Sequence, residues 1–334
     1  MSIVLIGPRA SAQNYGGIVV LFENIIANAA SINKYVGVID SNSRNYNNKV
    51  IMLFTIIFKL IKWWKYHAAL HGTELDFRIV GSILFLRKKL GGGGYSLRKF
   101  AGNYEEYFHN YSSFNRLIAE KMLANSSANF FETRQLVNIF KIYNSRTYWF
   151  PNVRAESKIR AIKYDSNTTF KVIFLSQVRK DKGIVDLIEA LGDIDGISLT
   201  IAGPIIDNAI SPSLLPKNIK YVGEIPPSEI YTMMSKHHLL ALPTFYSGEG
   251  YPGVIIEAFM IGLPILATTW RSIPELVGDA GILVPPNSPN EILKSVKSLR
   301  FSSHETYRIK SLDSAKAFSD FNVTTDYWSI LNNE

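Results

Sequence analysis

The sequence predicts an α/β protein made of two doubly wound domains. Short apolar runs alternate with helical stretches along both halves of the chain, which is the pattern of parallel sheets with crossover helices. A chain of 334 residues can hold two domains with separate cores. Its 47% hydrophobic and 19% charged content is that of a globular protein. We place the domains at 1–160 and 161–322, followed by a terminal helix at 323–334.

Apolar runs of strand length mark the expected sheets. In the first half, strands are expected at Ile3–Ile6, Tyr35–Asp40, Ala68–His71, Tyr95–Phe100, Asn129–Glu132 and Tyr148–Phe150. In the second half, they are expected at Phe170–Ser176, Ser198–Ala202, Ile219–Ile225, Leu239–Pro243 and Leu263–Thr268. Helices are expected between them, including Ile18–Ala29, Ile51–Trp64 and Glu105–Leu123. The polar run Arg154–Thr169 is interpreted as an interdomain linker.

Charge is distributed unevenly between the two halves. Residues 1–165 contain 22 Lys and Arg against 10 Asp and Glu, whereas residues 166–334 contain 14 against 18. The basic half is therefore expected to meet an anionic partner: a membrane surface, a lipid phosphate or nucleic acid. We see no recognition helix, zinc finger or aromatic RNA-binding strand, so nucleic acid is not expected. The chain has no Cys, and Ser2–Pro8 has the character of a first strand rather than a signal peptide, so a cytoplasmic protein is expected.

The most apolar segment, Ile51–Trp64, carries Lys59 and Lys62. It is shorter than the roughly 20 apolar residues needed to span a bilayer. We favour a crossover helix with one face in the core. The alternative, a helix lying at a membrane interface, is kept open by the combination of basic and aromatic side chains.

The stretch from Gly248 to Gly262 combines the features of an anion site. A glycine-rich turn follows the expected strand Leu239–Pro243, and Pro252 has the φ angle suited to the start of a helix. The free N–H groups of a helix amino end favour a diphosphate. Glu249 and Glu257 would repel phosphate, so we expect them to accept hydrogen bonds from hydroxyl groups. A ligand with both a diphosphate and several hydroxyls is a nucleotide sugar.

Glu249 and Glu257, separated by seven residues, resemble the E-x7-E motif of family four, the retaining glycosyltransferases of the GT-B fold. The flanking Ser-Gly-Glu-Gly-Tyr-Pro and Glu-Ala-Phe sequences also match. The resemblance implies two Rossmann-like domains facing each other across a cleft, with the nucleotide sugar on the second and the acceptor on the first. It also implies that Glu249 positions the sugar of the donor and that Glu257 binds the ribose of the donor's nucleotide. The loop residues expected to complete the donor site are Gly250, Tyr251, Pro252 and Gly253.

A second element resembles the family's basic loop. Residues 177–183, Gln-Val-Arg-Lys-Asp-Lys-Gly, resemble Gly-Arg-Leu-x-x-Glu-Lys-Gly, so Lys182 is expected to stabilise the donor diphosphate. Gln177 stands where the family has arginine, and Arg179 is the candidate to compensate. Gly223 matches a strand end that holds the nucleobase. Gly16 and Gly17 match a glycine loop over the diphosphate, for which a plain strand-to-helix turn is the alternative.

The resemblance extends more weakly to the acceptor side. Arg98 and Gly102 lie on and after an expected strand like the one that ends beside the acceptor in related bacterial enzymes, and His71 ends another strand. His67 and His71 would lie roughly 13 Å apart on a strand, so they are not expected to share a metal. Phe150–Val153 resembles the family's Pro-Asn element, and the terminal helix resembles one that returns to the first domain.

These features predict a metal-independent, retaining glycosyltransferase without a cofactor. The donor is expected to be linked to UDP or GDP, and the acceptor to be a glycan or a polyprenyl-diphosphate-linked glycan at the inner membrane face. Assembly of O-antigen, capsule or exopolysaccharide is the expected process. A GT-B epimerase or phosphorylase is the competing enzyme. A binding module without turnover is the competing non-enzyme, motivated by Gln177.

Overall fold

The computed structural model describes residues 3–11, 17–32, 35–301 and 304–332. The chain divides into two compact units, one containing 1–152 and 321–334, the other 153–320. Gly16 lies outside the described residues.

The first unit contains a six-stranded parallel sheet within the described residues, in the order β2-β1-β3-β4-β5-β6. Its strands are β1 (Ile3–Gly7), β2 (Tyr35–Asp40), β3 (His67–Gly72), β4 (Tyr95–Lys99), β5 (Ala128–Phe131) and β6 (Thr147–Trp149). Its helices are α1 (Gly17–Ser31), α2 (Lys49–Lys62), α3 (Glu74–Asp76), α4 (Ser82–Lys89), α5 (Tyr104–His109), α6 (Ser113–Asn125), α7 (Arg134–Phe140) and α14 (Asp320–Asn332). All six predicted strands are confirmed, with ends shifted by at most a few residues.

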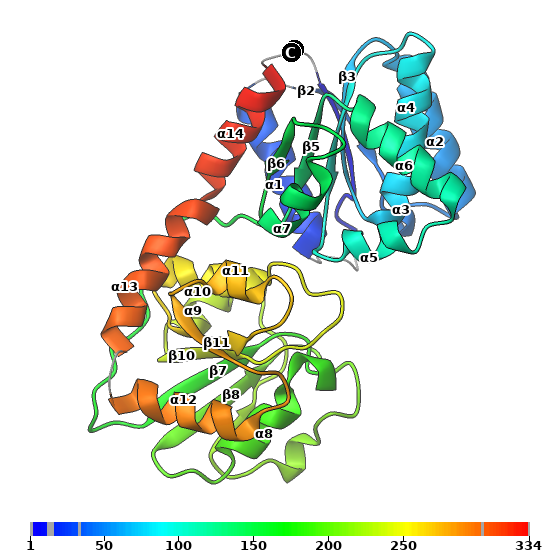
Figure 1. Ribbon diagram of the computed structural model, residues 1–334. Helices are drawn as coiled ribbons and strands as arrows, with labels where there is room; N and C mark the ends of the chain where they lie inside the picture. The colour runs from blue at the N-terminus through cyan, green and yellow to red at the C-terminus, as the bar shows by residue number, and fades with distance from the viewer. Residues whose placement is uncertain (1–2, 12–16, 33–34, 302–303, 333–334) are drawn as a thin grey trace. The chain divides into compact units, whose positions relative to one another are not determined.

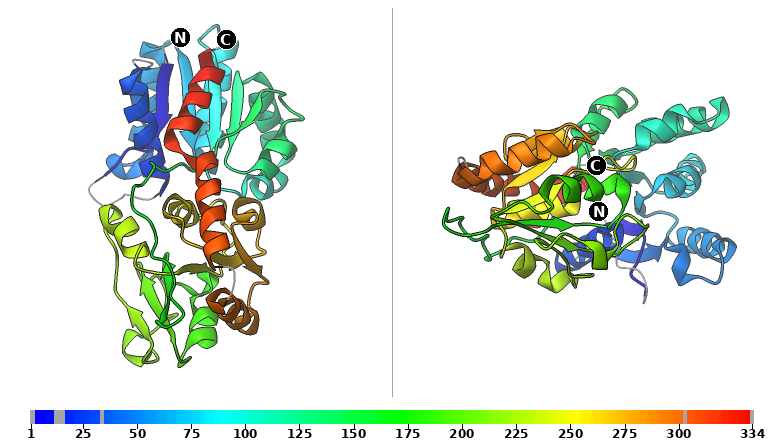
Figure 2. Two further views of the ribbon diagram at one scale, coloured as in Figure 1. Left: turned by 90° about the vertical axis from the view of Figure 1, so that its left-hand side faces the viewer. Right: turned by 90° about the horizontal axis from the view of Figure 1, so that it is seen from below.

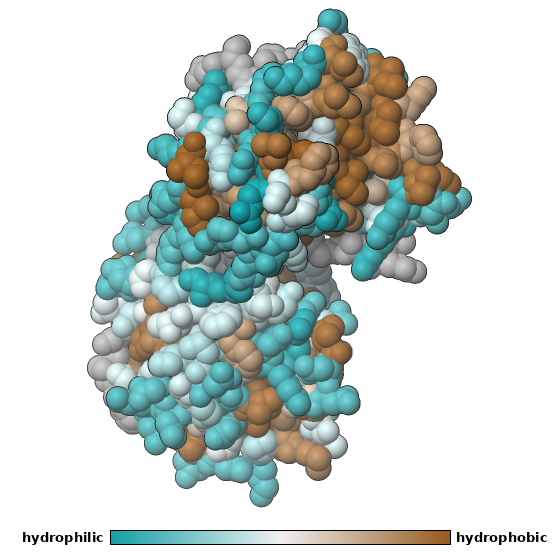
Figure 3. All heavy atoms as spheres, turned by 45° about the vertical axis from the view of Figure 1, so that its right-hand side comes forward, coloured by the Kyte–Doolittle hydropathy of each residue, from teal (hydrophilic) through white to brown (hydrophobic). Residues whose placement is uncertain are grey.

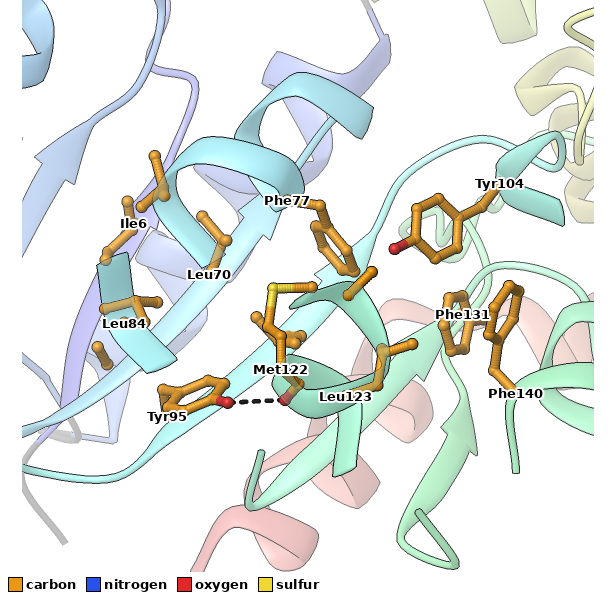
Figure 4. Close-up of a cluster of buried hydrophobic side chains, with 14 of the residues drawn as sticks. Ile6, Leu70, Phe77, Leu84, Tyr95, Tyr104, Met122, Leu123, Phe131 and Phe140 are labelled. Atoms are coloured by element: carbon orange, nitrogen blue, oxygen red, sulfur yellow. Dashed lines mark hydrogen bonds between the residues drawn. The ribbon is translucent and has the colours of Figure 1, made fainter. Parts of the chain in front are cut away.

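Two clusters of buried side chains cover the two faces of this sheet. One holds residues of α2, α4 and α6, among them Leu84 and Met122, whose main-chain oxygen accepts a 2.7 Å hydrogen bond from the Tyr95 hydroxyl (Figure 4). The other holds residues of α1 together with Tyr327 and Trp328 of α14. Figure 2 shows α14, in red, lying along the sheet of this unit. The last helix of the chain therefore completes the core of the first unit.

The second unit repeats the architecture with its own six-stranded parallel sheet among the described residues, in the order β12-β11-β10-β7-β8-β9. Its strands are β7 (Phe170–Leu175), β8 (Ile197–Ala202), β9 (Ile219–Tyr221), β10 (Leu239–Leu242), β11 (Ile265–Thr268) and β12 (Gly281–Val284). Its helices are α8 (Ile184–Leu191), α9 (Ile230–Met234), α10 (Gly253–Ile261), α11 (Ile273–Val277), α12 (Pro289–Phe301) and α13 (His304–Ala315). Helices α8 and α12 contact each other on one face, and α9, α10 and α13 cover the other (Figure 1).

Four details differ from the sequence-based expectations. Strand β12 (Gly281–Val284) was not expected. The run 105–123 forms two helices instead of one, because the Ser112 side chain caps the amino end of α6 by accepting a hydrogen bond from the Asn115 N–H. The run 154–169 is no free linker: Ala161 N donates to Ile261 O, and Arg154 pairs with the chain near Ser319. These contacts lie within the second unit, so the first boundary falls at 152/153 rather than at 160/161.

Neighbouring histidines precede β10 in the second unit, and both side chains are buried. His238 Nδ1 accepts a 2.9 Å hydrogen bond from the Lys171 N–H, and His237 Nε2 lies 2.9 Å from Thr200 Oγ1. Burial, which disfavours the charged imidazole, lowers the pKa of each to about 4. Both rings are therefore neutral in the folded protein at neutral pH.

Acidification is therefore expected to destabilise the second unit before its carboxylates titrate. Between about pH 6.5 and pH 4 the unfolded chain binds protons that folded His237 and His238 do not, so the free energy of unfolding falls as pH falls. From pH 7 to 5, urea unfolding should show a loss of up to about 2 kcal/mol per histidine. A His237→Gln variant should lose less than the wild type. A midpoint independent of pH over this range would contradict the prediction.

Candidate active site

Two loops of the second unit meet where its sheet reverses winding direction. The chain runs outward from β7 to β8 and β9, and then returns to the other side of β7 as β10. Ligands of doubly wound sheets bind at such a switch point, at the carboxyl ends of the strands. The loop after β7 contacts the loop after β10 directly, since Phe245 N donates a 2.8 Å hydrogen bond to Asp181 O. Gly183 has φ +77°, and a Cβ on it would lie 2.1 Å from Pro243 O.

A buried ion pair joins these two loops. Lys182 Nζ lies 2.6 Å from Glu249 Oε2, which also accepts a 2.7 Å hydrogen bond from Thr244 Oγ1. The same ammonium group lies 4.6 Å from the centre of the Tyr246 ring. The lysine and the first glutamate, predicted as site residues from separate motifs, are thus direct partners. A charge pair this well hydrogen-bonded is held in position before any ligand binds.

The remaining residues of the basic loop are arranged differently. Arg179 forms an ion pair with Asp181, with Nε 2.6 Å from Oδ1, and its guanidinium lies 4.9 Å from the centre of the Tyr246 ring. Gln177 is exposed. Arg179 is therefore engaged within its own loop, beside the aromatic ring that also contacts Lys182.

The second glutamate is engaged by a residue that the sequence analysis did not identify. Arg154 Nε donates a 2.7 Å hydrogen bond to Glu257 Oε1, and both side chains are mostly buried. The guanidinium lies over the first turn of α10, where a Cβ on Gly253 would be 2.0 Å from Nη2. A cation therefore occupies the amino end of α10, where the anion was expected. No spacing rule links Arg154 to Glu257, so no sequence signal was available to find it.

The rest of the turn before α10 supports this geometry. Pro252 is the amino-terminal cap residue of α10, and Gly262 ends the helix with φ +67°. Tyr251 is buried, and its hydroxyl donates to the Glu275 carboxylate at the start of α11. Gly250 is also buried. Gly223 follows β9 with φ +80°, and its carbonyl accepts a 2.8 Å hydrogen bond from Gly203 N.

On the first unit, the structure does not present Arg98 and His71 as surface contacts for an acceptor. Arg98 is fully buried between the Phe100 and Phe150 rings, 4.6 and 4.0 Å from their centres. His71 is also fully buried, with Nε2 3.0 Å from the Tyr327 hydroxyl, and burial holds its pKa well below the usual range. Both side chains are enclosed because α14 covers this face of the sheet. Gly102 lies half-buried in the loop after β4, and Gly17 begins α1.

A cavity of about 350 Å³ opens at the corresponding switch point of the first unit. It lies beyond the carboxyl ends of β1, β2 and β3. Apolar side chains such as Met52 and Leu75 line it together with polar ones, including Asn42, Thr73 and Asp76. Sequence reasoning did not predict this cavity, although the switch-point rule and the strand order would have indicated it.

Within the described residues, no group of three or more His, Asp or Glu side chains is arranged to hold a metal ion. In the same part of the chain, no helix is long and apolar enough to cross a membrane.

The segment that carries these loops resembles a known protein family. Residues 156–308 match the family described as glycosyl transferases group 1, which identifies this segment as a domain of that family. The O-antigen chain mannosyltransferase B of Escherichia coli is 35% identical over 109 residues, covering 32% of this chain and 28% of that protein. The matched region thus spans less than a third of the length of this relative.

Solved structures match the whole chain at low identity. Anabaena Alr3699/HepE in complex with UDP-glucose matches with a TM-score of 0.74 and 15% identity, covering 99% of this chain and all of that one. The lipopolysaccharide outer core galactosyltransferase WaaB matches with a TM-score of 0.70 and 13% identity, covering 100% and 99% of the two chains. The chain therefore has the GT-B fold of these structures, with two doubly wound Rossmann-like units.

The contact between Arg154 and α10 can be tested by a double-mutant cycle. Gly253→Ala should displace the guanidinium from Glu257 and lower the free energy of unfolding by about 1–2 kcal/mol, the scale of one charged hydrogen bond. In an Arg154→Ala background the same substitution should cost nothing or stabilise, because Ala is a better helix former than Gly. Urea unfolding of the four proteins measures the coupling. Additive effects would show that the contact is absent in solution.

Proposed function

We propose that this chain, with its group 1 domain and GT-B fold, is a glycosyltransferase that transfers a sugar from a nucleotide sugar to a hydroxyl group. One observation carries the proposal: Glu249 and Glu257 flank the amino end of α10 at the switch point, and each is held by a cation, Lys182 or Arg154. This arrangement combines hydroxyl acceptors and diphosphate-binding cations in one place. Neither a nicotinamide nor a metal site has comparable support among the residues the structure describes.

The donor is proposed to be a sugar linked to UDP or GDP. The structurally similar Anabaena protein was solved with UDP-glucose, which supports a nucleoside diphosphate sugar. Oε2 of Glu249 accepts hydrogen bonds from Lys182 and Thr244. These contacts fix the carboxylate, and its other oxygen is proposed to accept hydrogen bonds from the sugar hydroxyls. Glu257 is proposed to accept hydrogen bonds from the ribose hydroxyls. It does so either while it remains paired with Arg154 or after the donor has replaced Arg154 as its partner.

The proposed chemistry breaks the bond between C1 of the sugar and the diphosphate oxygen and forms a bond from C1 to the acceptor oxygen. The acceptor proton passes to the departing phosphate, and the anomeric configuration is retained. Negative charge on the leaving diphosphate grows in the transition state. Lys182 and the amino end of α10, where the Arg154 guanidinium adds a second positive charge, stabilise it there. The site is already arranged before the reaction, and this replaces a divalent metal.

The acceptor is proposed to be a glycan, or a glycan linked to polyprenyl diphosphate, at the inner face of the cell membrane. The basic first half of the chain supports an anionic acceptor or surface. The similarity to an O-antigen mannosyltransferase and to a lipopolysaccharide galactosyltransferase supports a role in bacterial surface-polysaccharide assembly.

The donor assignment can be tested by exposing the purified chain to a panel of UDP- and GDP-sugars. Thermal shift identifies the donor that binds, and release of the nucleoside diphosphate measures turnover. Binding without any turnover, with or without candidate acceptors, would favour a non-catalytic binding module. Formation of an epimer or a sugar phosphate would favour the other enzyme classes.

Replacing Lys182 should affect turnover more than donor binding. Lys182→Ala is expected to lower the initial rate at saturating donor on the order of 100- to 1000-fold, because the leaving group is more charged in the transition state than in the intact donor. Lys180→Ala, in the same turn but exposed, is the matched control and should retain the wild-type rate. A Lys182→Ala enzyme with normal turnover would remove this loop from the diphosphate site.

Activity is expected to survive chelation of divalent metals. In the proposed mechanism, Lys182 and the amino end of α10 with its Arg154 guanidinium supply the positive charge that a metal would otherwise provide. Sugar transfer should therefore proceed at the same rate before and after EDTA treatment and dialysis. Loss of transfer that magnesium or manganese restores would contradict the metal-independent mechanism.

A further inference from the structure

Helix α2 presents an apolar stripe to solvent. Its outward side chains are exposed by about half or more: Val50 61%, Ile51 45%, Phe54 69%, Phe58 71% and Ile61 59%. They recur at the three- and four-residue spacing that places them along one side of the helix. Figure 3 shows hydrophobic side chains gathered over this region of the first unit. A contiguous apolar surface of this kind on a globular protein marks an interaction site.

The exposed stripe lies on a different side of α2 from the side chains that pack in the core. Ile56 and Leu60 are buried against the sheet, and Met52 and Trp63 pack on the same cluster. The helix therefore already has the buried face that a crossover helix needs. The exposed phenylalanines contribute nothing to that packing, so folding of this unit does not account for them.

Helix α4 and the residues on either side of it carry exposed apolar side chains of the same first unit. Leu86 of α4 and Leu90, directly after it, are 58% and 65% exposed, and Ile79 of the helical segment before α4 is also exposed. Helices α2 and α4 pack on the same face of the sheet, through Leu60 and Leu84 of one buried cluster. We call the exposed apolar side chains of α2, together with Ile79, Leu86 and Leu90, the α2–α4 face.

The charges around the α2–α4 face have one predominant sign. Neither α2 nor α4 contains an acidic residue, and the exposed charges of both helices are lysines. Lys49 and Lys62 are exposed at the two ends of α2, Lys65 follows it, and Lys88 and Lys89 are exposed on α4. An apolar stripe bordered by lysines matches a surface with an apolar interior and anionic head groups.

We propose that the α2–α4 face docks on an anionic lipid bilayer, with α2 lying in the interfacial plane. The phenylalanines insert at the boundary of head groups and acyl chains, and the lysines contact lipid phosphates. At 14 residues, α2 is about 21 Å long, which suits an interfacial helix and not a spanning one. Pairing with a second copy of the same face would bring lysines against lysines, so charge favours the bilayer over self-association.

Docking in this way would also serve the proposed function, on which this step rests. Lys49 and Met52 of α2 line the 350 Å³ cavity at the carboxyl ends of β1, β2 and β3. Leu75, which lines the same cavity, is partly exposed. The cavity therefore borders the docking face. The head group of a lipid-linked acceptor could enter the cavity while its hydrocarbon chain remains in the bilayer.

Vesicle flotation tests the docking surface. The full chain is mixed with vesicles of phosphatidylcholine alone or of phosphatidylcholine with phosphatidylglycerol, whose anionic head groups attract basic side chains. Wild type should float with the anionic vesicles, and 0.5 M salt should reduce this by screening the lysines. Phe54→Ser/Phe58→Ser should lower the partition coefficient at least tenfold. The matched control is Phe321→Ser/Leu214→Ser, whose parent side chains are equally exposed elsewhere, and it should bind like wild type.

The outcomes separate docking from catalysis. Thermal shift with the nucleotide sugar reports the donor site, and both double variants should retain it, which also shows that they are folded. Absence of flotation with a normal donor shift would overturn docking and leave the proposed function intact. Flotation without a thermal shift for any nucleotide sugar would overturn the proposed function and leave docking intact. Equal flotation of the phenylalanine variant would overturn the assigned face, as would sedimentation showing a dimer that this variant converts to a monomer.

Discussion

Parallel pairing of β7 with both β8 and β10 forces the crossover connections of the second unit to leave in two directions. The loops after β7 and β10 then have no helix between them at the carboxyl edge of the sheet. The two loops therefore pack directly against each other, through the Phe245–Asp181 hydrogen bond and the close approach of Gly183 to Pro243. Lys182 and Glu249, 67 residues apart, become neighbours as a result. The candidate site thus follows from strand order.

The charges at this site are balanced before any ligand binds. Glu249 is paired with Lys182, and Glu257 with Arg154. An unpaired charge in such a buried position would lower the free energy of unfolding by several kcal/mol. Pairing therefore allows the folded protein to hold these charged side chains in its interior. A diphosphate donor brings both negative charge and hydroxyls, so it can interact with the cations and the carboxylates of these same pairs.

In the first unit, the same sheet architecture supports two different surfaces. Helices α1 and α14 enclose one face, where Tyr327 stacks on Phe150 and its hydroxyl meets His71. Arg98 and His71 are structural on that side. Helix α2, on the other face, leaves Phe54 and Phe58 in solvent, beside a cavity lined by its own first residues. The face that the chain leaves uncovered is the one that carries the basic charge.

The sequence by itself determined the α/β class and, within the described residues, every strand except β12, because these depend on local patterns. A family resemblance singled out Glu249 and Glu257 for the candidate site. Apolar runs define buried strands, and Pro252 and Gly262 delimit α10 through their own backbone preferences. Only the tertiary structure decided that Arg154 binds Glu257, since 103 residues separate them and no periodicity relates them. It also decided that Arg98 and His71 are buried, because their exposure depends on α14, which returns from the far end of the chain. Local preference acts over a few residues, whereas burial and partner choice depend on which distant segments pack together.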